Sequence, residues 1–227
     1  MSEKLGKTFQ LKNSPIQEAV ITFDCSSRTG LLTDEFAKRL SKDLSGDYPI
    51  MERLLVSEQS SPKSEEGEKG RAGWESVFAV RFKDADSASQ LVQYRENGFS
   101  FNRLEPYVSF SSYSDAIAAS WSCYLKHAKP TYLERISMRY INRIELPFDD
   151  SETSLSDYFT VVSSENAPAG LKLNGYFQAL HLCDSIPDIS AQLTISTQNV
   201  VDRKLVVIVD NEVSWKAEVK PADFQEY

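Results

Sequence analysis

The chain has 227 residues, of which 41% are hydrophobic and 11% aromatic, and its formal net charge is −8. This apolar content excludes disorder throughout the chain and suffices for one large domain or two small ones. The acidic balance disfavours binding to DNA or to an anionic membrane surface, because both attract basic proteins.

The expected cellular location follows from features that the sequence lacks. Residues 1–20 contain no apolar run behind a basic segment, so no signal peptide is expected, and no stretch approaches the length of a membrane-spanning helix. The three cysteines, Cys25, Cys123 and Cys183, are odd in number and widely spaced, as is typical of reduced thiols. We therefore expect a cytoplasmic protein.

The first half of the chain predicts a strand, a helix, four strands and a second helix. Ile16–Cys25 alternates between apolar and polar residues, and a helix is expected from Thr33, which can cap it, to Gly46. The polar segment Gln59–Gly73 has no apolar anchor and is expected to be a flexible loop. The other elements expected here are strands over Met51–Ser57 and Trp74–Phe82, two strands joined at Asn97-Gly98, and a helix over Tyr113–His127.

Asn97-Gly98 is a strong signal for a two-residue hairpin turn. A turn at these residues would place Tyr94 opposite Phe101. The apolar residues of the two strands would share one face: Val92, Tyr94, Phe99 and Phe101.

The second half predicts a long strand over Leu133–Leu146 and a short helix near Leu155–Val161. Four more strands are expected over Leu173–Cys183, Ile189–Thr197, Leu205–Val209 and Val213–Val219. The fold class is therefore α+β, with a curled, mainly antiparallel sheet over helices in a single compact unit spanning 1–227. The order of elements also fits a duplicated β-α-β4-α unit of the TATA-binding-protein-like kind, with pseudo-repeat halves 8–130 and 131–227 and the last helix missing.

Four parts of the chain carry a resemblance to a known family. They are NSPIQEAV near the start, YRENGFSFNRLEPY in the middle, RYINRIELP with the DYF that follows it, and the strand Ile189–Thr197. Together they resemble the "sporadically distributed" family of uncharacterised bacterial proteins. The resemblance implies a bacterial or mobile-element origin and an association with defence or toxin-neutralising genes. The family has no established catalytic residues, so it implies none here.

Few residues form a constellation typical of an enzyme or a metal site. Cys123 and His127 lie one helical turn apart and could form a nucleophile pair, although a core cysteine beside a helix-terminal histidine is the commoner arrangement. His181 and Cys183 share a strand face but lack a third ligand for zinc. The acidic pair Asp149-Asp150 is more typical of a loop than of a cation site. With neither a P-loop nor a GxGxxG pattern, we expect no cofactor, no metal and no catalytic residue.

The sequence feature that most suggests binding is a row of arginines. Arg135, Arg139 and Arg143 are four residues apart on one strand, so all three point to the same face of the sheet. They either pair with cross-strand acids such as Glu18 or Glu218, or they bind an anionic partner. The row is the candidate partner-binding site.

Three classes of function fit these observations. A non-enzymatic protein that recognises another protein is favoured, because no catalytic constellation is evident and the chain is acidic and rich in aromatic residues. A nucleic-acid-binding saddle fits the order of elements but not the net charge. A small-ligand-binding or enzymatic domain of the helix-grip kind would need a deep cavity between sheet and helices.

Overall fold

The computed structural model describes residues 11, 13–26, 30–57, 75–85, 89–148, 154–162, 175–183 and 188–221. The predicted loop 59–73 and the pair Asp149-Asp150 lie outside these residues. The elements, in chain order, are β1 (Ile16–Cys25), α1 (Asp34–Leu44), β2 (Ile50–Ser57), β3 (Glu75–Lys83), β4 (Gln90–Arg95), β5 (Gly98–Leu104), η1 (Phe110–Ser112), α2 (Ser114–Ala128), β6 (Leu133–Pro147), η2 (Leu155–Asp157), β7 (Phe177–Cys183), β8 (Ile189–Val201) and β9 (Lys204–Val219).

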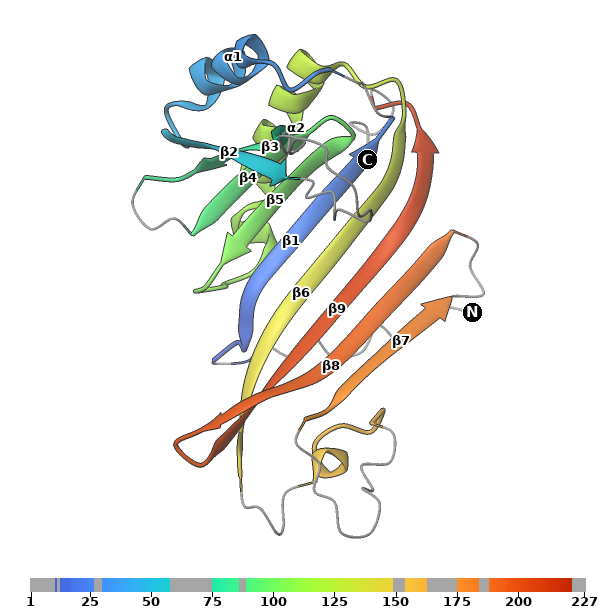
Figure 1. Ribbon diagram of the computed structural model, residues 1–227. Coiled ribbons are helices and arrows are strands. Elements are labelled where there is room, and N and C mark those ends of the chain that lie inside the picture. Colours follow the sequence, from blue (N-terminus) through green and yellow to red (C-terminus); the bar gives the residue numbers. More distant parts are fainter. Residues whose placement is uncertain are drawn as a thin grey trace, which may run out of the picture.

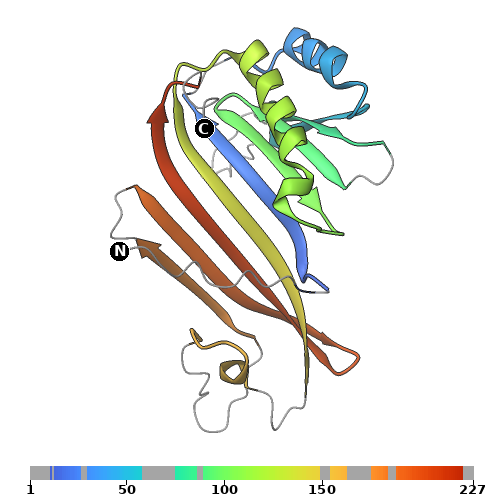
Figure 2. The same ribbon diagram turned by 180° about the vertical axis from the view of Figure 1, so that it is seen from behind.

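The strands form one antiparallel sheet in the order β2-β3-β4-β5-β1-β6-β9-β8-β7. Strand β1 comes first in the sequence but lies in the middle of the sheet, between β5 and β6 (Figure 1). The long strands β6 and β9 curve along their length, and α2 lies over the part of the sheet that contains β4 and β5 (Figure 2). The predicted α+β class with a mainly antiparallel sheet is confirmed. We call the face that α1 and α2 cover the helix face, and the opposite face the open face.

The two helices bury the apolar stripes that their sequences predict. The hydroxyl of Thr33 accepts a hydrogen bond from the backbone N–H of Phe36 at 3.1 Å, so it caps α1 as expected. Helix α2 ends at Ala128, and Lys129, which caps it, adopts the left-handed conformation just before Pro130. The stripes pack against β1, β3, β4 and β5 in one core, and their buried members are Phe36, Leu40 and Leu44 of α1 and Ile117, Trp121 and Tyr124 of α2.

The hairpin of β4 and β5 forms, but its register differs from the prediction. Tyr94 pairs with Phe99 and not with Phe101, because the turn consists of Glu96 and Asn97, and Gly98 already belongs to β5. Glycine is needed there since its φ is +151° and a Cβ atom would lie 2.3 Å from the carbonyl oxygen of Phe23. A shift of two residues keeps every side chain on its face, so the predicted apolar face is confirmed.

Strand β3 contains a bulge that the alternation of its sequence does not reveal. In an unbroken strand Phe78 would share a face with Val80 and Phe82, both of which are buried, yet the side chain of Phe78 is 51% exposed. Ala79 and Val77 pair with consecutive residues of β2, so Phe78 is the extra residue of the bulge.

The second half of the chain departs from the predicted order of elements. The segments Leu205–Val209 and Val213–Val219 are parts of one 16-residue strand, β9. Asp210 and Asn211 have the composition of a turn, but both continue the ladder with β6 and β8. Three strands therefore follow η2 in the described part of the chain, and not the four that the duplicated pattern requires. Leu155 of η2 anchors a second, smaller core at the far end of the sheet, with Leu146, Ile195 and Val207.

Candidate functional site

The three arginines of β6 lie on the open face, as their spacing predicts, and each of them forms an ion pair. Arg139 donates two hydrogen bonds to the carboxylate of Asp210 on β9, at 2.8 and 2.5 Å. Arg135 and Arg143 are also close to carboxylates, and between 35% and 45% of each of the three side chains stays exposed. The row is thus accessible to solvent, but its charge is balanced within the sheet.

The carboxylates that pair with Arg135 come from both neighbouring strands. Its Nε atom lies 2.8 Å from Asp24 of β1, and its Nη1 atom lies 3.0 Å from Glu212 of β9. Arg143 pairs with Glu145 on its own strand, and Lys204 and Arg143 together lower the pKa of Glu145 to about 2.

The acids named from the sequence are engaged elsewhere. Glu18 accepts a hydrogen bond from Asn102 at 2.6 Å, and Glu218 pairs with Lys216. A small cavity of about 160 Å³ opens beside the middle of the row, and it is lined by Arg139, Gln192, Asp210 and Glu212. An anionic partner would meet two carboxylates there, so partner binding by the arginine row stays a prediction.

The helix face of the second half presents apolar side chains that no described helix covers. Three of them are strongly exposed: Leu182 at 51%, Val213 at 50% and Trp215 at 40%. They lie in two neighbouring cross-strand rows with partly buried residues. In the first row, Trp215 pairs with Ile136 and Ile189. In the second row, Val213 pairs with Met138 and Ala191, and Ala191 pairs with Leu182. Ile136 already packs against the main core, so we call the other six residues the uncovered apolar surface.

The uncovered apolar surface continues the covered part of the same sheet face. Phe23 of β1 pairs with Ile136 of β6, so their side chains point to the same side. Trp121 of α2 stacks on Phe23. Trp215 lies two strands farther along the same row, and no aromatic side chain of a described helix covers it in this way. The order of apolar and polar residues along a strand indicates which residues share a face, but not whether a described helix covers that face.

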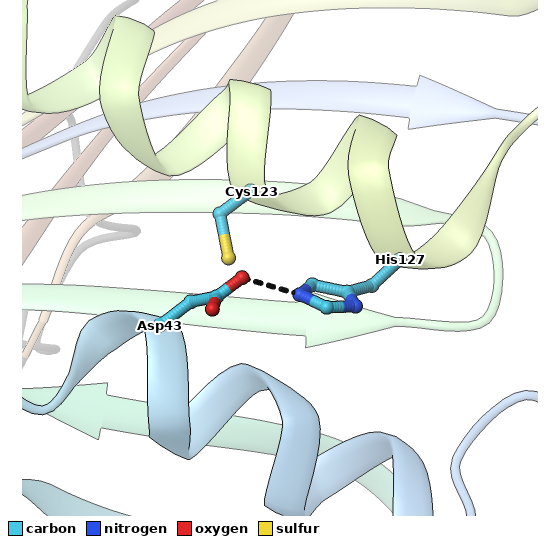
Figure 3. Close-up of side chains that lie close together, drawn as sticks. All are labelled: Asp43, Cys123 and His127. Carbon is cyan, nitrogen blue, oxygen red and sulfur yellow. Dashed lines mark hydrogen bonds and ion pairs between the residues drawn. The ribbon is translucent and has the colours of Figure 1, made fainter.

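A third group lies where α1 meets α2. Cys123 and His127 are on one side of α2, as their spacing predicts, and Asp43 in the last turn of α1 lies against them (Figure 3). The Nε2 atom of His127 is 2.7 Å from the Oδ2 atom of Asp43, and Nζ of Lys126 is 2.6 Å from the same oxygen. These two contacts, that of Lys126 first, lower the pKa of Asp43.

The geometry of this group does not suit a nucleophile and its base. The imidazole Nε2 atom of His127 faces Asp43 and not the sulfur of Cys123 (Figure 3). Burial raises the pKa of the Cys123 thiol, so the thiolate form is disfavoured. Sequence reasoning missed Asp43 because no local signal links α1 to residues about eighty positions away.

The other cysteine–histidine pair is on the outermost strand. His181 and Cys183 of β7 are both exposed. Within the described part of the chain, the group of Asp43, Cys123 and His127 is the one whose ligand atoms converge closely enough to hold a metal ion.

No protein-family model matches the chain, and no curated protein matches it either. The resemblance to the "sporadically distributed" family therefore stays a prediction. Among the described helices, none combines the length and the apolar composition that a membrane crossing requires.

Proposed function

We propose that this chain is a non-enzymatic recognition protein, and that its uncovered apolar surface binds an amphipathic helix of a partner protein. The observation that carries this proposal is the exposure of Leu182, Val213 and Trp215 in adjacent rows of one sheet face. Contiguous apolar surface of this kind is typical of protein-binding sites, and a tryptophan within it is a typical anchor.

The first half of the sheet supports a helix as the binding partner. Going outward from β1 the strands are β5, β4 and β3, and going outward from β6 they are β9, β8 and β7. We propose that the two halves are related by duplication. Helix α2, which follows β5 and packs on the helix face, then has its counterpart position over β9 and β6. An amphipathic helix in that position would bury Trp215 as α2 buries Phe23.

A partner can be identified by cross-linking from within the surface. We would replace Val213 with the photoreactive residue p-benzoylphenylalanine in the full chain and irradiate it in a lysate of the source organism. We expect a discrete adduct with one protein, in which the linked residues repeat every three or four positions. A synthetic peptide of that segment should then bind the purified chain, and Trp215→Asp should weaken this binding at least about tenfold, because a buried carboxylate opposes apolar contact.

The same photoreactive residue at Gln192 is the matched control, because Gln192 lies on the open face two strands from the arginine row. Adducts from both positions to the same protein would contradict the proposed surface. So would adducts from Val213 that contain only this chain, whether from residues 1–12 of the same molecule or from a second copy. A chain that lacks residues 2–10 separates these last two cases.

A further inference from the structure

We propose that Asp43, Cys123 and His127 form a binding site for a divalent transition-metal ion, zinc above all. Their ligand atoms (one sulfur, one nitrogen and one carboxylate oxygen) all lie within 4.8 Å of one another. Thiolate, imidazole and carboxylate are the three kinds of protein ligand that zinc takes. Zinc sites with three protein ligands and water in the fourth position are common, so these three residues suffice. The site is independent of the surface that binds the partner helix.

The two helices hold the ligands in place before any ion arrives. Cys123 and His127 are four residues apart on α2, so both side chains leave the same side of the helix toward α1. Asp43 precedes the buried Leu44 of α1, and Tyr124, next to Cys123, is also buried in the core. Since all three ligands stand on packed helices and none on a loop, little ordering is needed upon binding.

Small side-chain movements would complete the coordination. Zinc–ligand bonds of roughly 2.0–2.3 Å in a tetrahedron place ligand atoms about 3.3–3.8 Å apart. The 2.7 Å hydrogen bond between His127 and Asp43 must therefore open, and the sulfur of Cys123, which lies within 4.8 Å of both other ligand atoms, must take a similar spacing. The Asp43 side chain keeps 28% of its surface exposed, so water can reach the fourth position.

Two negative charges of the site balance the two positive charges of the ion when it binds. Cys123 is buried and gives up its thiol proton to solvent, and the resulting thiolate and the Asp43 carboxylate together neutralise a divalent ion. Lys126 holds the same oxygen of Asp43 and competes with the ion. Its side chain is 64% exposed and can turn into solvent, so it weakens binding without blocking it.

Cobalt titration of the reduced, purified full chain tests the proposal. We expect one equivalent of Co²⁺ to produce the absorption bands of a tetrahedral ion and a thiolate-to-cobalt charge-transfer band, and Zn²⁺ to abolish both. Cys123→Ser, His127→Gln and Asp43→Asn should each weaken binding at least about tenfold, which is the least that even supporting residues of metal sites cost. Lys126→Met should strengthen it, because the competing cation is gone.

Cys183→Ser is the matched control, since Cys183 is exposed on β7, and it should leave the titration unchanged. Loss of the charge-transfer band in this variant, or its persistence in Cys123→Ser, would place the ion elsewhere and overturn the proposal. Failure of the parent chain to bind Co²⁺ below millimolar concentration would also overturn it. Asp43 is exposed, so Asp43→Asn provides a folded comparison if Cys123→Ser proves unstable, and a zinc-dependent rise in Tm gives a second readout.

Discussion

The indole ring of Trp121 on α2 stacks on the phenyl ring of Phe23 on β1, with centroids 4.7 Å apart and planes inclined by 18°. This contact fixes the helix to the central strand of the sheet. Trp121 is 4% exposed and also contacts Phe99, so it packs with the buried residues of the hairpin.

Trp121→Ala should lower the free energy of unfolding by about 3–5 kcal/mol, because it empties a large volume in a packed core. Trp215→Ala is the matched comparison on the same sheet face, and it should cost only about 1 kcal/mol or less since its side chain is 40% exposed. Chemical denaturation of both variants measures the difference. Equal losses would mean that Trp215 is covered as well.

Gly98→Ala should destabilise the protein by about 3 kcal/mol or more. The new Cβ atom would collide with the backbone of Phe23, and an alanine at φ +151° is strained in addition. Gly46→Ala is the control. Apart from its two chain neighbours, no atom of the described residues lies within 4 Å of the position that its Cβ would take, so the change should be nearly neutral. A stable Gly98→Ala variant would show that β1 and β5 can separate there.

Arg139→Gln should change the free energy of unfolding by about 1 kcal/mol or less, since exposed ion pairs contribute little. The difference from the parent chain should shrink as sodium chloride is added, because salt screens the attraction to Asp210. A larger, salt-independent loss would mean that the pair is structural. If the arginine row binds a partner, the same variant should weaken that binding while the fold is retained.

The three cysteines should react with Ellman's reagent at very different rates. Cys183 is exposed and should react quickly in the native protein, whereas burial raises the pKa of Cys25 to about 12 and also raises that of Cys123. We expect one fast thiol at mildly alkaline pH and three in denaturant. A fast phase that survives in Cys183→Ser would show that a helix or the central strand opens readily.

Short sequence patterns correctly predicted the elements whose positions depend on interactions between residues close together in the chain. The strand Ile16–Cys25 has the predicted bounds, and the helix that Thr33 caps lies where it was expected, because alternation and capping act over a few residues. Gly98 shows the limit of such patterns. The Asn-Gly pair predicts a turn at both residues, but a contact with β1, far away in the sequence, places Gly98 in the strand.

The other differences between the sequence-based predictions and the structure also arise from contacts between residues far apart in the chain. Asp210 suggests a turn within β9, but it is held in the ladder by its ion pair with Arg139. The spacing of Cys123 and His127 makes them neighbours on one helix, while Asp43 joins them only because α1 and α2 pack together. The arginine row is evident from its spacing, whereas the acids that balance it come from strands whose order the sequence does not reveal.

The central place of β1 has a consequence for how the chain folds during synthesis. Strand β1 is made before the other described strands, yet its two neighbours, β5 and β6, follow only after α1 and three other strands have been made. Most other neighbours in the sheet are consecutive strands, which can pair as soon as they emerge. The face of β1 that carries Phe23 therefore lacks its partner strand until β5 has been made, and transiently exposed apolar surface of this kind favours aggregation.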